Sequence, residues 1–368
     1  MDSAEVPQRV VLAPDSFKGS AAATEVARAI ARGWAAVRPQ DLLRLMPMAD
    51  GGEGTLDAFE LAVPGSVRVP VRVTGPDDRP VDSSWLALPD GTGVVELAST
   101  SGITLLDPLR PLDAHTEGFG EAIAHALDTG VRRLLLAIGG SSSTDGGVGA
   151  LSALGARFLD ADEHPIASGG RGLASLRRVD TSRLRALPRG GVRILSDVIS
   201  PLLGPSGAAA VFGPQKGADP DTVAELEAGL AVLARQLRAD PVAPGTGAAG
   251  GTGFGLLAWG AAMAPGAAAV GEALGLPEVL AEADVAITGE GRFDAQSSEG
   301  KVPSYVAELG AAAGGRAMLV AGSIAAPTDG FAAAVSLVQA AGGLDAALAN
   351  PLRWLEEAGR ALALSHRP

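Results

Sequence analysis

The sequence predicts an α/β protein with two domains, in which a second α/β domain is inserted into a discontinuous doubly wound domain of the flavodoxin or Rossmann type. Near both ends of the chain, short apolar runs lead into polar, glycine-rich loops, as in parallel β-loop-α units. In between, apolar and polar residues alternate, as in antiparallel strands. We therefore expect residues 1–70 and 281–368 to form the doubly wound domain and residues 71–280 the inserted domain.

The first two expected strands each open into a polar loop. Residues 9–13 form an apolar run, and the loop DSFKGS follows it. From Thr24 onward, apolar residues recur at helical spacing, which predicts an amphipathic helix that stops before Pro39. Residues 42–46 predict a second strand, which leads into the loop ADGGEGT and a helix over 56–61.

The inserted region contains the longest glycine-rich loop. Alternation over 67–73 and 84–88 predicts antiparallel strands at its start. Residues 134–138 then predict a buried strand that opens into GGSSSTDGG, and apolar residues recur from Val148 to Ala156 at near-helical spacing. Backbone amides at a helix N-terminus stabilise anions, so this loop could hold a phosphate. An ordinary strand-to-helix turn explains the same glycines, and both interpretations stay open.

The rest of the chain supplies further strands and two helices. A strand from residue 192 ends at Asp197, and a long helix is expected over 220–238. The uncharged stretch 241–271 contains three prolines and nine glycines, so we expect a short buried helix over 254–270 and no membrane span. Three more strands are expected in the second half of the doubly wound domain, over residues 285–288, 318–321 and 335–338.

Composition excludes several classes of function. The net charge of −13 and the pI near 4.8 work against nucleic-acid binding. The chain has no cysteine, which excludes disulfides, thiolate catalysis and cysteine-ligated metals. Its four histidines lie outside the glycine-rich loops, so we expect any general base to be a carboxylate. The N-terminal residues MDSAEVPQRV lack the apolar run of a signal peptide, which predicts a soluble, cytoplasmic protein.

Standard nucleotide and hydrolase motifs give no assignment. The chain lacks GxxxxGK[ST], GxSxG and HExxH. One GxGxxG occurs at Gly245, Gly247 and Gly250, but it follows prolines and no strand. We interpret it as a flexible or tightly packed loop and not as a dinucleotide site.

Charged residues recur in six of the polar loops. Because the carboxyl ends of parallel strands face the ligand crevice of an open sheet, we expect these charges to converge there. Carboxylates with Lys and Arg are the groups that magnesium-dependent phosphoryl transfer requires. A cap or turn role is an alternative for any one of them. The residues are Asp15, Lys18, Asp50, Glu53, Asp145, Asp197, Lys216, Glu290, Arg292, Asp294 and Lys301.

Five loop motifs, in this order and spread over nearly the whole chain, resemble those of the type 1 glycerate kinase family. They are DSFKGS, ADGGEGT, GGSSSTDGG, FGPQKGA and ITGEGRFDAQSSEGK. The resemblance implies ATP-dependent phosphorylation of D-glycerate to 2-phosphoglycerate and ADP, in a cleft between two α/β domains that lack a P-loop. ATP is therefore one expected cofactor, and the carboxylates of the polar loops in a protein of net charge −13 predict Mg²⁺ as the other.

Two departures from the family pattern concern hydroxyl groups. Ser143 and Thr144 stand where Thr and Asn usually precede the Asp of the central loop, and Ser196 and Ser200 replace a Cys and an Asn near Asp197. Both changes keep hydrogen-bonding groups, so we expect activity to survive. The change at Thr144 leaves the preferred substrate more open.

Together, the residue pattern and the resemblance predict individual roles. As catalytic residues we expect Asp197 and Asp294, then Asp145, as the proton acceptor, together with Lys18. Asp50, Asp145 and Asp197 are the expected metal ligands. The residues expected to bind substrate or phosphate are Asp15, Ser16, Lys18, Gly51, Gly52, Glu53, Gly139, Gly140, Ser141, Ser142, Lys216, Glu290, Arg292 and Lys301.

Three alternatives remain open at this point. The enzyme could be a glycerate 3-kinase, or a kinase of another small hydroxy acid. It could also be a two-domain carboxylate-binding protein without chemistry, although several acidic loops near an anion argue against this unless a metal intervenes. Small molecules are the expected partners, with no nucleic acid and no membrane, and the protein is expected to be a monomer or a homodimer.

Overall fold

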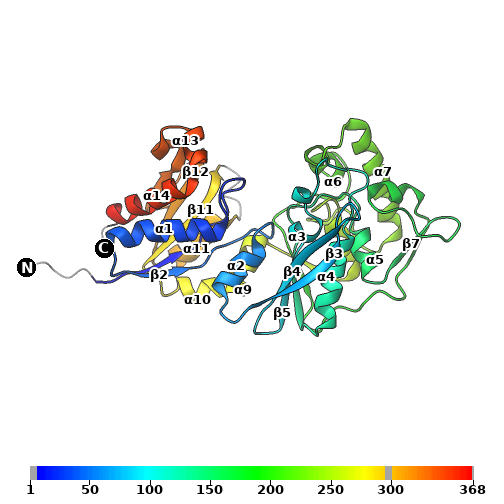
Figure 1. Ribbon diagram of the computed structural model, residues 1–368, viewed down its shortest axis with the longest axis horizontal. Coiled ribbons are helices and arrows are strands. Elements are labelled where there is room, and N and C mark those ends of the chain that lie inside the picture. The colour runs from blue at the N-terminus through cyan, green and yellow to red at the C-terminus, as the bar shows by residue number, and fades with distance from the viewer. Residues whose placement is uncertain (1–5, 295–300, 367–368) are drawn as a thin grey trace, which may run out of the picture. The chain divides into compact units, whose positions relative to one another are not determined.

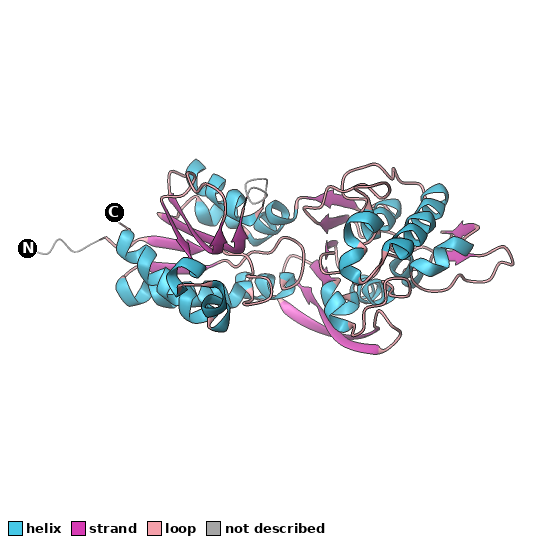
Figure 2. Ribbon diagram, turned by 90° about the horizontal axis from the view of Figure 1, so that it is seen from above, coloured by secondary structure: helices cyan, strands magenta, loops and turns pink. Residues whose placement is uncertain are grey.

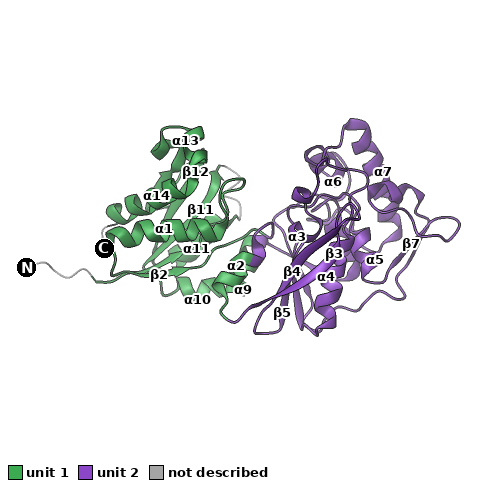
Figure 3. Ribbon diagram, viewed as in Figure 1, with its two compact units in different colours: residues 1–50, 57–64, 267–368 green, residues 51–56, 65–266 purple. Residues whose placement is uncertain are grey.

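The computed structural model describes residues 6–294 and 301–366, which form two compact units (Figure 3). Unit 1 comprises residues 1–50, 57–64 and 267–368, and unit 2 comprises residues 51–56 and 65–266. Each unit is built from helices around a sheet that contains parallel strands, so the α/β class predicted from the sequence is confirmed. In the described part of the chain, no helix has the length and apolar character that crossing a bilayer requires.

Unit 1 contains a five-stranded sheet in the order β13-β12-β11-β1-β2, and every neighbouring pair in it is parallel. Its strands are β1 Arg9–Leu12, β2 Leu42–Leu45, β11 Val285–Phe293, β12 Arg316–Ile324 and β13 Ala333–Ser336. The helices lying wholly or mainly in this unit are α1 Ala23–Val37, α2 Thr55–Ala62, α9 Gly266–Leu274, α10 Leu276–Leu280, α11 Val302–Ala312, α12 Leu337–Ala341, α13 Leu344–Ala349 and α14 Pro351–Ser365.

Helices cover both faces of this sheet (Figure 2). Apolar side chains of α1 and α14 pack in one buried cluster with those of β1 and β11. Figure 1 shows the two helices α1 and α14 side by side. The helices α1 and α14 approach so closely at Gly33 that a Cβ there would lie 1.9 Å from the carbonyl oxygen of Glu356. On the opposite face, Gly310 of α11 lies against Ala286 of β11. Both faces of this parallel sheet are therefore covered, as is usual for parallel sheets.

The strands β11 and β12 run further than the sequence predicted. Their pairing continues to Phe293 and Ile324, so Glu290 and Arg292 lie on a strand and not in a loop. Glycines make this possible, since a Cβ on Gly322 would lie 2.3 Å from the carbonyl oxygen of Gly291. The strand expected over 335–338 is also displaced: β13 ends at Ser336, whose hydroxyl accepts a hydrogen bond from Gln339 N and starts α12.

Unit 2 contains a six-stranded sheet in the order β10-β9-β6-β5-β4-β3. The first four of these strands are parallel, and β4 is antiparallel to both β5 and β3. The strands of unit 2 are β3 Val67–Thr74, β4 Pro80–Ala87, β5 Thr92–Glu96, β6 Arg133–Ala137, β9 Val192–Leu195 and β10 Ala262–Ala264, with a separate pair β7 Arg157–Leu159 and β8 Arg178–Asp180.

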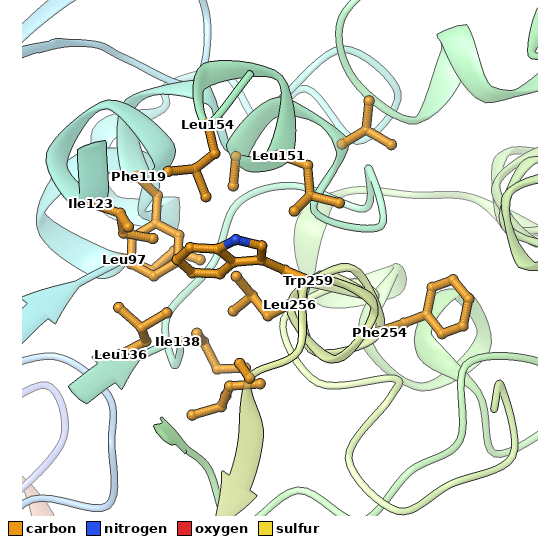
Figure 4. Packing of buried hydrophobic residues seen from close by; sticks show 14 of the residues in the cluster. Leu97, Phe119, Ile123, Leu136, Ile138, Leu151, Leu154, Phe254, Leu256 and Trp259 are labelled. Atoms are coloured by element: carbon orange, nitrogen blue, oxygen red, sulfur yellow. The ribbon is translucent and has the colours of Figure 1, made fainter. Parts of the chain in front are cut away.

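The α-helices of unit 2 are α3 Ala98–Ser101, α4 Glu117–Asp128, α5 Val148–Ala153, α6 Ala208–Phe212, α7 Pro220–Gln236 and α8 Thr252–Trp259. Its 3-10 helices are η1 Ile103–Leu105, η2 Gly170–Ser175 and η3 Pro214–Lys216. Side chains of α4, α5, α8 and β6 meet in the main core, among them Phe119, Leu151, Leu256 and Leu136 (Figure 4).

Two expectations about unit 2 were wrong in detail. Residues 254–270 are not one short helix, because α8 ends at Trp259, Gly260 follows with a φ of 106°, and β10 then pairs with β9. The helix α5 ends at Ala153, so Ala156 lies beyond it. The loop with the GxGxxG spacing is tightly packed, since a Cβ on Gly247 would lie 2.2 Å from the carbonyl oxygen of Pro201.

The chain crosses from one unit to the other more often than a single inserted domain would need. Residues 51–56 belong to unit 2, where Gly51 O accepts a hydrogen bond from Gly139 N and Leu56 N donates to Glu96. Residues 267–280 belong to unit 1, where Gly271 of α9 lies against Tyr305 of α11. Residues 51–56, which were expected in the doubly wound domain, therefore belong to unit 2. Residues 267–280, which were expected in the inserted domain, belong to unit 1.

Candidate active site

A pocket of about 400 Å³ lies in unit 1 at the carboxyl edge of its sheet. From β1 the chain continues to β2 on one side, whereas β11 lies on the other side of β1. Ligands of open α/β sheets bind at such a reversal of strand order. The polar residues of the pocket are Asp15, Ser16, Lys18, Ser20, Asp50, Glu290, Arg292, Asp294, Lys301 and Ser323, and the larger apolar ones are Phe17, Leu337, Val338, Leu344, Leu348 and Pro351.

Backbone hydrogen bonds hold Asp15 at the centre of this edge. Asp15 N donates to Gly289 O at 2.8 Å, which continues the pairing of β1 with β11 beyond the strand itself. On the other side, Met48 N donates to Pro14 O at 2.8 Å. The side chain is fixed as well, since Asp15 Oδ1 accepts a hydrogen bond from Ser16 N at 2.6 Å. The carboxylate therefore has a defined place between two strand ends.

The surroundings of Asp15 favour its protonated form. Burial, then the negative charge of Asp50, raises the pKa of Asp15 to about 7, against the opposing effects of the Ser16 amide and Lys18. Lys18 Nζ lies 3.1 Å from Asp50 Oδ2, and the charge of Asp50 raises the pKa of Lys18. The result is a carboxyl group that exchanges a proton near neutral pH beside a fixed positive charge, which suits a general base.

The pocket also has a cationic side and an apolar side. Arg292 Nε lies 3.3 Å from Asp294 Oδ2, and Lys301 is the residue that precedes the first turn of α11. Leu344 and Leu348 of α13 also line the pocket and supply apolar surface. An apolar wall next to several cations suits a ligand with a flat ring at one end and phosphates at the other.

In unit 2, a second group of glycine-rich loops gathers at the carboxyl ends of β6 and β9. Gly139 follows β6, and its N–H donates to Gly51 O at 3.0 Å. A Cβ on Gly139 would lie 2.6 Å from Gly52 Cα, and one on Gly51 would lie 2.3 Å from Leu195 O. Only glycine allows these backbones to approach so closely. The structure therefore brings together the predicted residues Gly51, Gly52, Gly139 and Gly140, with Glu53 exposed beside them.

Asp145 lies inside unit 2 and has no exposed surface. Its Oδ2 accepts hydrogen bonds from the hydroxyl and N–H of Thr116 and from Gly149 N, and its Oδ1 accepts from Gly147 N and the Ser143 hydroxyl. These five bonds occupy the carboxylate and hold the start of α5. The geometry therefore favours a structural role for Asp145 over that of a base or metal ligand.

Asp197 and Lys216 occupy different settings in unit 2. Asp197 is exposed after β9, and its Oδ1 accepts a hydrogen bond from Gly266 N, at the start of α9, at 2.6 Å. Lys216, in η3, is buried, and its ammonium donates to the Ser141 hydroxyl and to Ser143 O. Burial lowers the pKa of Lys216 to about 7. Ser142 is buried too, and its hydroxyl donates to Ser101 O.

The three expected metal ligands are divided between the two units. Within residues 6–294 and 301–366, no group of three or more acidic or histidine side chains could by itself hold a metal ion. Asp50 belongs to unit 1, whereas Asp145 and Asp197 belong to unit 2. Mg²⁺ in phosphoryl-transfer enzymes is commonly held by one or two carboxylates together with substrate phosphates. Asp50 and Glu290, which both line the unit 1 pocket, fit that pattern.

The position of Asp15 after the first strand could be predicted from the sequence, but its proton affinity could not. That property depends first on burial and then on the charges of Asp50, which follows β2, and Glu290, which lies within β11. The apolar side of the pocket was also missed, because α13 is short and its exposed leucines resemble ordinary surface residues.

Comparison with known proteins decides the family. The model of the Glycerate kinase family matches residues 10–366. The chain belongs to the glycerate kinase family. It is 39% identical to the glycerate kinase of Halalkalibacterium halodurans over 96% of this chain and 97% of that protein. It is 41% identical to the glycerate 2-kinase of Escherichia coli strain K12, over 82% of this chain and 81% of that protein.

A solved structure supports the same assignment. The crystal structure of a protein from Salmonella typhimurium LT2, provisionally described as glycerate kinase 2, matches with a TM-score of 0.84 and 39% sequence identity. The match covers 98% of both chains. The family resemblance and the assignment to the kinase class of enzymes, both made from the loop motifs, are confirmed.

The raised pKa of Asp15 predicts a pH-dependent effect of Asp15→Asn on stability. Between pH 3.8 and about 7 the folded protein holds a proton on Asp15 that the unfolded chain has released. Wild-type stability therefore loses a contribution as the pH rises through this range. The variant should be more stable than the wild type, by a margin that grows from pH 4 to pH 7 and then levels off. Denaturant unfolding of both proteins at several pH values measures this margin, and a constant margin would contradict the assignment.

Proposed function

We propose that the protein transfers the γ-phosphoryl group of ATP to the 2-hydroxyl of D-glycerate, giving 2-phosphoglycerate and ADP. The observation that carries the proposal is the pocket at the strand-order reversal of unit 1, where Asp15 exchanges a proton near neutral pH beside Lys18. Membership of the glycerate kinase family supports the reaction class.

The nucleotide occupies the unit 1 pocket in this proposal. Its adenine ring packs on the apolar side formed by Leu344 and Leu348, and its phosphates face Lys18, Arg292 and Lys301. A protein with a net charge of −13 needs such a local group of cations, together with a metal ion, to bind a polyphosphate. ATP enters as its magnesium complex, and Asp50 and Glu290 would hold the ion, which neutralises phosphate charge when bound.

Asp15 takes the proton of the attacking hydroxyl. Its raised pKa makes it a better proton acceptor than an ordinary carboxylate, and Ser16 N and the Phe17 to Ser20 turn hold its loop in place. Lys18 stabilises the negative charge that remains after proton transfer. This proposal places the base on Asp15, ahead of Asp197 and Asp294, because Asp197 accepts from Gly266 N and Asp294 pairs with Arg292.

The 2-position is supported by the name of the Escherichia coli relative, glycerate 2-kinase. Phosphorylation at the 3-position and activity on another small hydroxy acid are the alternatives. A panel of hydroxy acids in a coupled ATP-consumption assay separates them. The absence of ATP consumption with every acid would favour the carboxylate-binding alternative.

Exchange of the proton acceptor tests the mechanism. Asp15→Asn should lower kcat by about 10² to 10⁴ because it removes the base, while KM for ATP changes less than about threefold. Asp294→Asn, in the same pocket, is the matched control and should lower kcat by less than Asp15→Asn does. Steady-state kinetics of both variants, with Asp197→Asn alongside, measure this. A larger loss of kcat in either of the other two variants would overturn the assignment of Asp15.

The position of the new phosphate can be read from the product itself. Enolase converts 2-phosphoglycerate directly, whereas 3-phosphoglycerate requires a mutase first. We expect the purified protein with D-glycerate and ATP to give an enolase signal without added mutase. A signal that appears only after mutase is added would refute the 2-position and leave the kinase assignment standing.

A further inference from the structure

We propose that Lys216 is a positioning residue, whose buried ammonium fixes the Ser141 hydroxyl as a donor to the carboxylate of a small hydroxy acid bound at Gly140 and Ser141. The proposal rests on the proposed function, in which glycerate is the phosphoryl acceptor. It names the part of the chain that recognises the acidic end of that substrate.

Lys216 is placed too deeply to contact a ligand itself. Its side chain is 2% exposed, and its Nζ donates to Ser141 Oγ at 2.7 Å and to Ser143 O. Burial of an ammonium group is unfavourable unless its donors are satisfied, so this arrangement is specific. Asp145, which lies near enough to favour the charged form of Lys216, supplies the opposite charge.

The ammonium group of Lys216 determines whether the Ser141 hydroxyl donates or accepts a hydrogen bond. In its charged form Lys216 has donors only, so Ser141 Oγ accepts the hydrogen bond from the ammonium group. The hydroxyl hydrogen of Ser141 is then directed elsewhere, and among the described residues it donates to none. Ser141 is 7% exposed, whereas Lys216 is 2% exposed, so Ser141 is the more accessible of the two residues.

Two backbone amides next to this hydroxyl are likewise available. Gly139 N donates to Gly51 O at 3.0 Å and Ser142 N donates to Ser101 O at 3.1 Å. Between them, the N–H groups of Gly140 and Ser141 donate to no residue in the described part of the chain. Gly140 is exposed and has a φ of 75°, a conformation that glycine adopts without strain. Two adjacent residues thus present three donors.

These donors fit a carboxylate better than a polyphosphate. They are neutral groups, and the charge of Lys216 behind them is offset by Asp145, so the loop suits a single negative charge. The exposed cations Lys18 and Arg292 are in unit 1, where the nucleotide is proposed to bind. A carboxylate can accept all three hydrogen bonds with its two oxygens.

The test compares variants of the donor and of the residue behind it. Ser141→Ala should raise KM for D-glycerate at least tenfold and leave KM for ATP within about twofold. Lys216→Met should do the same, and the double variant should be no more than about twofold worse than either single one, because Lys216 acts through Ser141. Ser143→Ala is the matched control: it keeps the carbonyl group that Lys216 contacts, and KM for glycerate should change less than twofold.

Isothermal calorimetry separates this inference from the proposed function. Wild-type protein should bind D-glycerate without ATP and should not bind glycerol, which lacks the carboxylate. Ser141→Ala should weaken glycerate binding at least tenfold, and Ser141→Thr, which keeps a hydroxyl, should restore it. These results would support the carboxylate subsite even if no phosphorylation were seen. Unchanged glycerate affinity in Ser141→Ala would overturn this inference. So would a loss in the double variant that equals the product of the two single losses. If Lys216→Met fails to fold, the glycerate affinity of Ser141→Ala decides.

Discussion

Burial of Asp15, together with its repulsion by Asp50, sets the chemistry of the proposed active site at the carboxyl edge of the unit 1 sheet. Parallel pairing of β1 with β2 and β11 brings the loops that follow these strands together, so the two negative charges cannot separate. Lys18 compensates part of that charge through its contact with Asp50. Burial raises the pKa of Asp15 and the charge of Asp50 raises it further, so Asp15 gains a proton affinity suited to catalysis near neutral pH.

Close backbone approach is the second constraint. In unit 1, Gly291 and Gly322 allow β11 and β12 to stay paired past the point where polar side chains begin, which turns Glu290 and Arg292 into fixed residues of the pocket. In unit 2, Gly51 and Gly139 hold two loops together over the ends of the strands. In both units, glycine allows two backbone segments to approach more closely than a residue with a Cβ would permit, and these close contacts hold the loops of the site in place.

Much of this could be predicted from the sequence, because strands that end in polar loops carry their own signal. The five motifs identified the family, and the alternation over 67–73 located the antiparallel strands. The chemical roles of the charged residues could not be predicted, since those depend on contacts between distant segments. Asp145 resembles a catalytic aspartate in its loop, yet five internal hydrogen bonds occupy it. Lys216 resembles an anion-binding lysine beside glycine, yet it is buried behind Ser141.

The most direct test of the account is a carbon-13 NMR titration of the aspartate carboxyl groups in the protein without ligands. The resonance of Asp15, identified by its loss in Asp15→Asn, should titrate with a midpoint near pH 7. In Asp50→Asn, the midpoint should move to lower pH, because the neighbouring negative charge that raises the pKa of Asp15 is gone. A midpoint near pH 4 in the wild-type protein, or one that does not move in Asp50→Asn, would contradict the account.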